Sequence, residues 1–414
     1  MYRYPNHEVS TALLTREEND LLCKVGPGTL MGELFRRFWL PATLSWELPE
    51  PDCAPTRLRL LSEDLVLWRN TDGTVGAMQN ACPHRGASMF FGRNEENGLR
   101  CVYHGWKFDT EGACVDMPNE PAESNFKHKI KAAAYPVAEM AEMLWIYMGP
   151  QEQQPPLPQL DWTDLPSGHR YSNKWHQKCN WAQGLEGNVD SSHVGFLHKW
   201  FDASASEEAG GGSPNRDYRD TAPVLTVKET EFGYVYGARR TTDNGYYWRL
   251  TPFILPCFTI VPGPADPTWL RRVDYTVPMD DENTWWFRTI YRPAEALNPD
   301  RVWQYRRGEF HFPRMVAGTW DPVPNAANDY LIDRDMQRTV NYTGISNGRE
   351  QDMAIVETMG MVYDRTVEHL GTADTAIIAF RRLVLKLGRQ LQQGICKRRW
   401  SSRPRAGIEV GHSG

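Results

Sequence analysis

The chain lacks the features of several protein classes. Its apolar stretches stay well below the roughly 18 residues that a membrane-spanning helix needs, and its first residues lack the apolar core of a signal peptide. The 414 residues carry 46 Lys and Arg against 52 Asp and Glu, and the net charge of -6 leaves no basic footprint for nucleic acid. We therefore expect a protein that binds neither a membrane nor a nucleic acid.

Cysteine is sparse and irregularly spaced. There are eight cysteines, at positions 23, 53, 82, 101, 114, 179, 257 and 396. Apart from the pair at 82 and 101, their spacing shows no disulfide framework, which favours a reducing cytoplasm as the location. We expect the six others to be ordinary buried thiols.

Two of these cysteines stand close to histidines. Cys82 lies two residues before His84, and Cys101 lies three residues before His104, with sixteen residues between the pairs. The order Cys-x-His, Cys-x-x-His is the ligand set of a Rieske [2Fe–2S] cluster, in which two thiolates hold one iron and two imidazoles hold the other. Because neutral imidazoles donate less charge, the histidine-bound iron accepts the electron.

A zinc site is the main alternative for these four side chains, because zinc also takes two Cys and two His at short spacing. A zinc finger, however, pairs Cys with Cys and His with His along the chain and continues into a helix. Here each pair is mixed, and a glycine (Gly86, Gly105) follows each histidine closely. Glycine lets the backbone fold tightly around inorganic sulfide, which favours the cluster.

The pattern along the chain predicts an N-terminal arm with helices (1–39), a small all-β domain (40–150) and a larger domain (151–414). A capping-box pattern at Thr15 predicts a short helix, and a second short helix is predicted at 31–39. The strand-like runs that follow are 57–61, 65–68, 75–78 and 144–147. A Gln- and Pro-rich linker is predicted at 151–158.

The larger domain mixes helices and strands. A helical segment is predicted at 175–198 and a mobile surface loop at 203–214. The runs of strand-like pattern are 224–240, 246–261, 270–279 and 284–291, and those of helical periodicity are 350–369 and 374–394. The simplest assembly is an α+β fold with a strongly twisted antiparallel sheet.

A second set of ligand types lies at Asp190, His193 and His198. Histidines five residues apart are about 140° apart on a regular helix, so binding one metal would require a distorted turn or a helix end. Alone, they could simply pack or cap a helix, but the cluster motif implies a redox centre on the same chain. Asp190 could hydrogen-bond the His193 imidazole and fix its tautomer, or be a solvent-facing cap.

A carboxylate would complete a 2-His-1-carboxylate site, which leaves positions open on ferrous iron for dioxygen. Asp352 is the candidate because it shares a helical face with Ile355, Val356 and Met359. A carboxylate on an apolar face is costly to bury unless it is paired or bound to metal. The alternative is a carboxylate favoured by a helix N-terminus, and Glu357 is the rival ligand, better placed in a supporting or surface role.

With these motifs the chain resembles the Rieske non-haem iron oxygenases, and more closely the catalytic alpha subunits of the phthalate dioxygenase-like group. The resemblance covers nearly the whole chain, and the segments that carry it are 16–33, 82–87, 101–108, 179–198 and 351–360. It implies an all-β Rieske domain followed by a helix-grip (Bet v 1/START-like) catalytic domain with a curved antiparallel sheet. It also implies that His193, His198 and Asp352 hold Fe2+, and that Asp190 bridges His193 to His104 of the neighbouring subunit.

The resemblance further implies partners and a reaction. Subunits would form rings of three, sometimes stacked in pairs, and a flavin and iron–sulfur reductase would supply electrons from NAD(P)H. The expected reaction uses dioxygen to dihydroxylate the ring of an aromatic carboxylate of the phthalate or isophthalate type, and O-demethylation of a methoxylated aromatic acid is the alternative. A Rieske electron-transfer protein and an iron–sulfur regulator are rivals of other classes; the chain beyond residue 150 argues against the first, and the second histidine pair against the other.

A carboxylate-bearing substrate requires a fixed cation, and arginine can grip a carboxylate through two hydrogen bonds. The candidates are Arg216, Arg239, Arg240 and Arg249, with Arg216 and Arg249 favoured. Arg249 lies on a strand predicted to line the cavity. For each arginine taken alone, an exposed strand charge is the simpler explanation.

Overall fold

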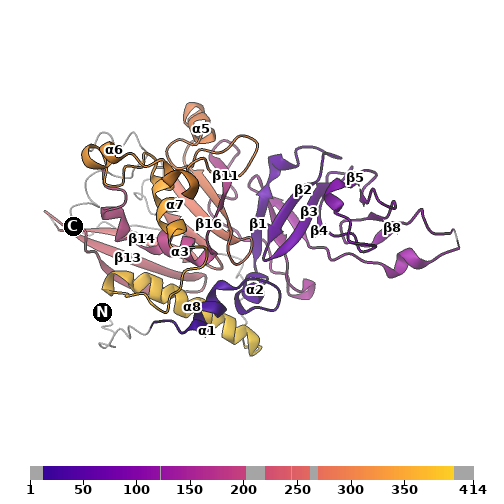
Figure 1. Cartoon of the computed structure of the whole chain (residues 1–414), viewed down its shortest axis with the longest axis horizontal. Helices are drawn as coiled ribbons and strands as arrows, with labels where there is room; N and C mark the ends of the chain where they lie inside the picture. Colours follow the sequence, from indigo (N-terminus) through magenta and orange to yellow (C-terminus); the bar gives the residue numbers. More distant parts are fainter. Residues whose placement is uncertain (1–12, 122, 202–219, 244, 262–268, 396–414) are drawn as a thin grey trace.

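The computed structural model describes residues 13–395, apart from 122, 202–219, 244 and 262–268. Two parts follow each other along the longest axis, one built of short antiparallel sheets and the other of a large antiparallel sheet with helices against it (Figure 1). The predicted α+β fold is confirmed, while the loop predicted at 203–214 lies outside the described residues. Within the described part, no helix combines the length and the apolar character needed to cross a bilayer.

Two short helices, α1 (Arg16–Cys23) and α2 (Leu30–Phe35), precede the first sheet. The predicted capping box at Thr15 is present at the start of α1. The second helix ends earlier than predicted, because strand β1 (Trp39–Leu44) begins where the helix was expected to end. All six residues of β1 are buried and five of them pair with β10, so tertiary pairing outweighs the local helical preference.

The first part contains three antiparallel sheets, with strand orders β1-β10-β9, β2-β3-β4 and β5-β6-β7-β8. The strand bounds are β2 (Thr56–Leu60), β3 (Glu63–Arg69), β4 (Val75–Gln79), β5 (Arg93–Asn94), β6 (Leu99–Arg100), β7 (Lys107–Phe108), β8 (Cys114–Asp116), β9 (Val137–Met140) and β10 (Met143–Tyr147). The short 3-10 helices are η1 (Ser45–Glu47), η2 (Met89–Phe91), η3 (Phe126–Lys129) and η4 (Gln151–Gln153). The strands predicted from residue 57 to 78 and at 144–147 are confirmed.

The second part is built on a seven-stranded antiparallel sheet of order β11-β17-β16-β15-β14-β13-β12. The strand bounds are β11 (Arg170–Gln177), β12 (Val224–Thr230), β13 (Gly233–Thr242), β14 (Gly245–Ile254), β15 (Phe258–Val261), β16 (Arg271–Pro278) and β17 (Thr284–Tyr291). The helix bounds are α3 (Trp181–Val189), α5 (Pro299–Arg306), α6 (Arg334–Thr339), α7 (Gly348–Thr358) and α8 (Thr375–Gln392), and those of the 3-10 helices are η5 (His193–Gly195), η6 (Ala326–Leu331) and η7 (Thr372–Asp374).

Four of the predicted elements of this part were wrong in their extent. The runs 224–240 and 246–261 are each two strands, because the chain reverses between β12 and β13 and between β14 and β15. Of the helix predicted at 175–198, only α3 forms as an α-helix. Residues 175–177 instead complete strand β11, which pairs with β17 over eight residues. The helix predicted at 350–369 ends with α7.

Different parts of the chain pack against the two faces of the large sheet. On one face, the Tyr234 hydroxyl donates to the Ala376 carbonyl of α8 at 3.0 Å, and α3 and α7 lie on the same side (Figure 1). On the other face, Trp145 of β10 contacts Phe258 and Tyr275 edge-on, with ring centroids 6.1 and 6.2 Å apart. The sheet is therefore held between its helices and the first part of the chain, in a helix-grip arrangement.

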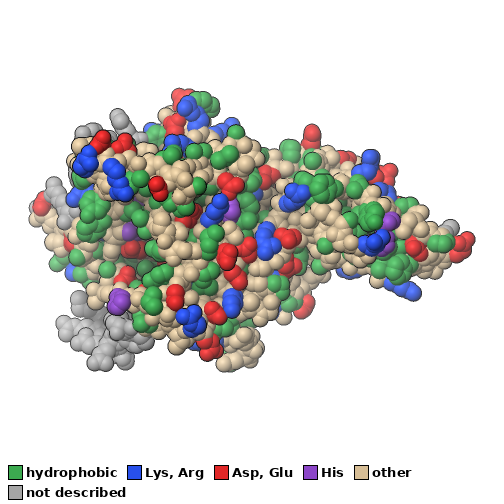
Figure 2. Space-filling view, in the orientation of Figure 1, with side chains coloured by type: hydrophobic (Ala, Val, Ile, Leu, Met, Phe, Trp, Pro, Cys, Tyr) green, Lys and Arg blue, Asp and Glu red, His purple; other side chains and the backbone are tan. Residues whose placement is uncertain are grey.

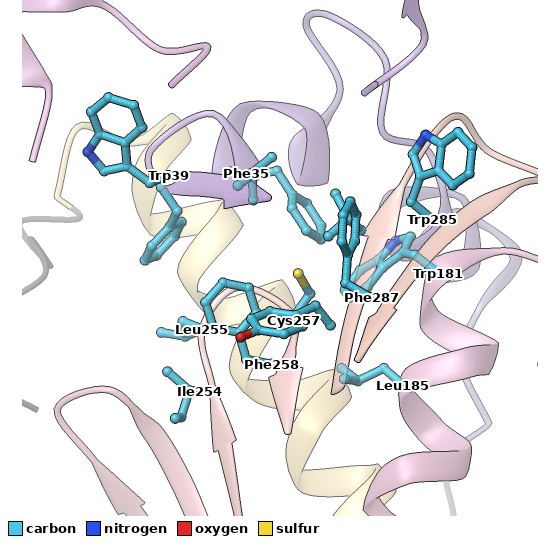
Figure 3. Packing of buried hydrophobic residues seen from close by; sticks show 14 of the residues in the cluster. Phe35, Trp39, Trp181, Leu185, Ile254, Leu255, Cys257, Phe258, Trp285 and Phe287 are labelled. Carbon is cyan, nitrogen blue, oxygen red and sulfur yellow. The ribbon is translucent and has the colours of Figure 1, made fainter. Parts of the chain in front are cut away.

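One apolar core joins the two parts. Figure 3 shows Phe35 of α2 and Trp181 of α3 among the residues of this core, and their rings meet edge-on with centroids 4.8 Å apart. The same apolar core also includes Trp39 of β1 and Phe258 of β15. Burial of this shared apolar surface holds the two parts in a fixed arrangement.

A buried lysine also crosses the joint between the parts. The Lys174 ammonium of β11 donates to Thr43 Oγ1 at 2.6 Å and lies 2.8 Å from Glu47 Oε1. It also sits over the rings of Trp285 and Trp320, 4.6 and 4.7 Å from their centroids. Burial lowers the pKa of Lys174, and the Glu47 carboxylate opposes that shift.

Candidate metal centres

The two loops that carry the Cys–His pairs have the same backbone turn. The Cys82 N–H donates to the Ala87 carbonyl at 2.8 Å, and the Gly86 N–H returns to the Cys82 carbonyl at 2.8 Å. The second loop repeats both bonds, from Cys101 to Trp106 at 2.8 Å and from Gly105 to Cys101 at 2.9 Å. Both glycines take the left-handed conformation, with φ of 75° and 79°, that other residues seldom adopt. The turns present two thiols and two imidazoles to one point.

The four side chains have the state that a metal cluster requires. Cys82 and Cys101 are buried, and burial together with the neighbouring Cys101 sulfur raises the pKa of Cys82 to about 11. The His84 and His104 rings lie 4.5 Å apart, and within the described residues neither Nδ1 atom has a hydrogen-bond partner although both are buried. Two buried cysteines and two imidazole nitrogens without partners fit a [2Fe–2S] cluster, which the sulfurs would bind as thiolates.

The surroundings of this site combine a small core with an exposed apolar rim. Trp106 stacks on His84 at 4.4 Å between ring centroids and donates from Nε1 to Asn119 Oδ1 at 2.7 Å. Beside the histidines, Val102 and Tyr103 are exposed. Figure 2 shows histidine atoms at the surface of this end of the molecule, among hydrophobic and basic side chains.

The second set of residues comes together where α3 ends. The helix stops at Val189 and Asp190 is its C-cap residue, so His193 opens the separate 3-10 helix η5. The helix end expected from the five-residue spacing is thus present. The His193, His198 and Asp352 ligand atoms lie within 4.8 Å of one another, with Asp352 contributed by α7.

Each imidazole turns its Nε2 to the shared carboxylate and its Nδ1 to a second partner. The Nε2 atoms of His198 and His193 lie 3.0 and 3.7 Å from Asp352 Oδ1. The His198 Nδ1–H donates to Gln351 Oε1 at 2.7 Å, and His193 Nδ1 lies 3.5 Å from Asp190 Oδ2. Partners at Nδ1 leave the Nε2 lone pairs for a metal.

The other oxygen of Asp352 faces an arginine. Oδ2 lies 3.5 Å from Arg349 Nη1, and Arg349 is fixed by a 2.6 Å hydrogen bond from Nη2 to Gln177 Oε1 and by stacking over Trp286. Burial alone would raise the pKa of the Asp352 carboxyl, but His198 and Arg349 outweigh it and hold that pKa well below its usual range. Asp352 is therefore an ionised carboxylate with one oxygen free to bind metal.

Asp190 is also kept ionised. Burial would raise the pKa of this carboxyl, but His193 and the backbone N–H groups of Ser192 and His193 lower it instead. Asp190 Oδ1 accepts the Ser192 N–H at 2.6 Å, which fixes the carboxylate at the helix end. Its Oδ2 is thereby directed to His193.

The surroundings of Asp352 differ in part from the prediction. The apolar helical face is incomplete, since Ile355 and Met359 are nearly half exposed and only Val356 is buried. Glu357 does not join the three ligands; it accepts hydrogen bonds from the Tyr330 hydroxyl at 2.7 Å and from a backbone N–H. Glu357 thus has the supporting position expected for it.

The candidate arginines are placed differently from one another. Arg249 pairs with Ala238 across β13 and β14 on the helix-bearing face of the sheet. Burial would lower the pKa of His193, but the Asp190 and Asp352 carboxylates outweigh it and raise that pKa, against a small opposing effect of the Arg249 charge.

Arg240 and Arg239 are less suited to bind a substrate. Arg240 is fully buried and donates to the Ser191 carbonyl at 2.5 Å and hydroxyl at 3.2 Å, so it holds the segment beside Asp190. Arg239 lies over the Tyr246 ring on the opposite face. Arg216 lies outside the described residues.

Comparisons with known proteins agree with this geometry. Residues 38–136 match the model of the Rieske [2Fe-2S] domain, and residues 146–398 match the model described as LigXa C-terminal domain like. The chain is 38% identical to the 3-chlorobenzoate-3,4-dioxygenase oxygenase subunit of Comamonas testosteroni, over 90% of this chain and 88% of the relative. It is 37% identical to the phthalate 4,5-dioxygenase oxygenase subunit of Pseudomonas putida (92% and 88%) and 31% identical to the 5,5'-dehydrodivanillate O-demethylase oxygenase subunit of a Sphingobium species (92% and 82%).

Solved structures share the fold. The terminal oxygenase of carbazole 1,9a-dioxygenase from Nocardioides aromaticivorans is similar with a TM-score of 0.59 at 20% identity, over 90% of this chain and 97% of that one. The reduced oxygenase–ferredoxin complex of carbazole 1,9a-dioxygenase gives 0.59 at 21% identity (92% and 94%). The chain belongs to the Rieske non-haem iron oxygenases and, within them, to the oxygenase alpha subunits of the phthalate dioxygenase-like group. Its cofactors are a [2Fe–2S] cluster and a mononuclear non-haem iron.

Sequence reasoning missed two residues beside the iron site, Gln351 and Arg349. Gln351 and Arg349 precede Asp352 on α7 and are buried. Polar residues that precede a candidate ligand indicate a supporting role only if they are buried. Their burial is known only once the packing of α7 is known.

We predict that Gln351→Leu weakens iron binding at the second site. The substitution removes the acceptor for His198 Nδ1–H, so the ring loses its fixed tautomer and orientation, and iron affinity should fall about 10- to 100-fold. Iron titration of the apoprotein measures this. Gln392→Leu, at an exposed position of α8, is the matched control, and equal affinities in the two variants would contradict the orienting role.

Proposed function

We propose that this chain is the terminal oxygenase of a multicomponent system that uses dioxygen to hydroxylate an aromatic carboxylate. The observation that carries the proposal is the meeting of His193, His198 and Asp352 within 4.8 Å, because two histidines and one carboxylate leave coordination positions free for substrate chemistry. When bound, the iron supplies dioxygen activation and the cluster supplies electrons.

Each metal has its own residues in this proposal. Cys82, Cys101, His84 and His104 hold the cluster within a domain of residues 40–150. The three ligands of the second site hold the iron within residues 151–414, and Gln351 and Asp190 fix the two imidazoles through their Nδ1 atoms.

Assembly follows from the separation of the two centres. The strands beside the cluster loops lie at one end of the longest axis, and α3 and α7 lie in the other part (Figure 1). We infer a homo-oligomer, a ring of three subunits, in which His104 of the partner subunit approaches Asp190. Asp190 would then join the histidines of the two centres through one carboxylate.

The electron donor is inferred to be a separate protein. A flavin and iron–sulfur reductase that oxidises NAD(P)H, or a ferredoxin between the two, would dock near the exposed rim at Val102 and Tyr103. A cytoplasmic location suits this supply of reduced nucleotide.

The substrate class rests on Arg249 and on the relatives. Arg249 places a guanidinium on the helix-bearing face of the sheet, the side of the helices that carry the iron ligands, where it can bind a carboxylate. The relatives are named for oxidation of 3-chlorobenzoate and phthalate, which are aromatic acids. Ring dihydroxylation is the proposed reaction. O-demethylation is the second candidate, because a relative of comparable coverage is a demethylase subunit.

Product analysis tests the proposal. The holoenzyme, with a surrogate reductase, is offered benzoate, phthalate, isophthalate and methoxybenzoates, and products are identified by mass. A cis-dihydrodiol supports dihydroxylation, and formaldehyde with a phenol supports demethylation. A preparation with cluster iron alone that oxidises none of them would leave an electron-transfer protein as the better explanation.

We predict that Arg249→Ala raises KM for an acid substrate by about tenfold or more, because a charge-assisted bond is lost. KM for the corresponding methyl ester should change little. Arg239→Ala, which removes an arginine from the opposite sheet face, is the control. Equal increases for acid and ester would remove Arg249 from the anchoring role.

A further inference from the structure

An array of aromatic rings begins beside the iron site and has no role in the proposed function. Arg349, whose Nη1 lies 3.5 Å from Asp352 Oδ2, stacks over the Trp286 ring at 3.7 Å from its centroid. Gly184 of α3 leaves room for this ring, because a Cβ at that position would come within 2.9 Å of it. Trp286 is thus separated from a candidate iron ligand by one guanidinium group.

The array continues from Trp286 across the sheet to two tyrosines. Trp286 of β17 and Trp175 of β11 pair in register, and their rings stack with centroids 5.9 Å apart and an interplanar angle of 17°. The Phe312 ring contacts the Trp175 ring at 6.2 Å and the Tyr171 ring at 5.3 Å between centroids. Tyr171 in turn stacks on Tyr305, with centroids 6.0 Å apart. Contacts between rings therefore connect the iron site to two phenols.

The phenol end of the array lies near the surface. Tyr171 is partly exposed, and Tyr305 belongs to α5, which lies at the outer edge of the second part (Figure 1). A phenol that loses an electron also releases its proton, and the partial exposure of Tyr171 gives that proton access to water. An oxidised ring at this end can also be reduced from solution.

The two tryptophans between the iron site and the phenols are buried without polar partners. Trp175 and Trp286 are fully buried, and among the described residues neither Nε1 has a hydrogen-bond partner. Buried polar groups without a partner are rare, and a redox role is one explanation for them. An indole that loses an electron here has no acceptor for its N–H proton. The missing electron is then replaced from the next ring instead of being fixed by loss of the proton.

Two guanidinium groups decide which oxidants can use the array. Arg349 lies over Trp286, and Arg288 lies over Trp175 at 5.5 Å from its centroid. The attraction between a cation and an aromatic face is lost when the ring itself becomes a cation, so both indoles are harder to oxidise. Only a strong oxidant at the iron site can therefore take an electron from them. Such an oxidant persists when no substrate is there to react with it.

We propose that Trp286, Trp175, Tyr171 and Tyr305 form a hole-transfer path that protects the iron site when dioxygen is reduced without a substrate to accept its oxygen. Hydrogen peroxide, the two-electron reduction product of dioxygen, accepts two more electrons and two protons at this site and becomes two waters. Each phenol supplies one electron through the two indoles and releases one proton to water, and the site takes up its two protons from water. A soluble thiol then returns one electron and one proton to each phenoxyl.

Radical trapping in the absence of substrate tests this inference. The iron-loaded holoenzyme is mixed with hydrogen peroxide and frozen rapidly for electron paramagnetic resonance, and a spin trap with peptide mass analysis locates the radicals. In the wild-type enzyme we expect radicals on Tyr171 or Tyr305. Trp175→Phe keeps an aromatic ring but removes the oxidisable indole. Most of the signal on the two phenols should be lost, and oxidation should move to Trp286 and the iron ligands.

Trp162→Phe is the matched control. Trp162 is also fully buried with no partner for Nε1 among the described residues, but its ring contacts Tyr275 and Tyr291 instead of the array. This variant should give the wild-type radicals. If Trp175→Phe and Trp162→Phe give equal radical yields at the two phenols, or if the wild-type enzyme forms none there, the rings only fill the core and the inference fails.

Two further variants keep the test decisive if Trp175→Phe does not fold. The double variant Tyr171→Phe, Tyr305→Phe removes only two hydroxyls, and peroxide should oxidise its His193 and His198 faster than those of the wild-type enzyme; equal rates would contradict a protective path. Asp352→Ala removes a ligand of the mononuclear iron and should form no radicals on the phenols. Radicals that persist there would show that peroxide attacks the phenols directly, and the inference would fail.

Discussion

Asp352→Ala is expected to remove the mononuclear iron and leave the cluster in place. Among the described residues, Asp352 Oδ1 is the one anionic ligand atom facing both His193 and His198, and two neutral imidazoles alone bind ferrous iron weakly. Iron content should fall from about three to about two atoms per chain. Turnover should be lost, while the visible and electron paramagnetic resonance spectra of the cluster stay unchanged.

Glu357→Gln is the matched control for this variant, because Glu357 lies on the same helix and is the rival carboxylate. It accepts the Tyr330 hydroxyl instead of facing the histidines, so its loss should leave about three irons per chain. If Glu357→Gln loses the third iron and Asp352→Ala retains it, the assignment of the carboxylate ligand is reversed. Melting temperatures of both variants separate loss of metal from loss of fold.

Asp190→Asn is expected to lower turnover about a hundredfold or more while both metals stay bound. The amide keeps an oxygen for the Ser192 N–H, so the helix end is preserved. It cannot carry the negative charge that faces His193 Nδ1. Reoxidation of the reduced cluster in a single turnover with substrate and dioxygen should slow by the same factor. Loss of iron from this variant would instead give Asp190 a structural role.

A mixed assembly tests whether Asp190 acts between subunits. Chains with Asp190→Asn have an intact cluster, and chains with His104→Ala have an intact Asp190. In a ring, the cluster of the first kind can serve the iron of the second kind, so co-expression should restore activity that neither variant has alone. Activity that stays absent in the mixed assembly would contradict an electron path across the interface.

Most of the candidate metal ligands could be proposed from the sequence because their signals are local. Cys82 with His84, and Cys101 with His104, are short motifs whose spacing alone restricts the chemistry. His193 and His198 required the inference of a distorted turn or a helix end, and α3 ends at Asp190, three residues before His193.

The supporting residues could not be predicted, because their roles depend on contacts far apart in the chain. Gln351 contacts His198 across 153 positions, and Arg349 contacts Gln177 across 172. The helix predicted at 175–198 was too long for the same reason. Its first residues look helical but complete a strand, because β17 lies beside them in the folded molecule. Local propensity is a weak guide where pairing of this kind decides the outcome.

The Lys174 contact restricts how such enzymes can be recombined. A chimera that takes its cluster domain from another oxygenase, without a counterpart of Glu47, would leave the ammonium of Lys174 enclosed by Trp285 and Trp320 without a counter-ion. Breaking a buried pair in this way costs about 3 to 5 kcal/mol. The two halves are therefore expected to be inherited together, and a successful exchange of modules would need to move the lysine and its carboxylate as a unit.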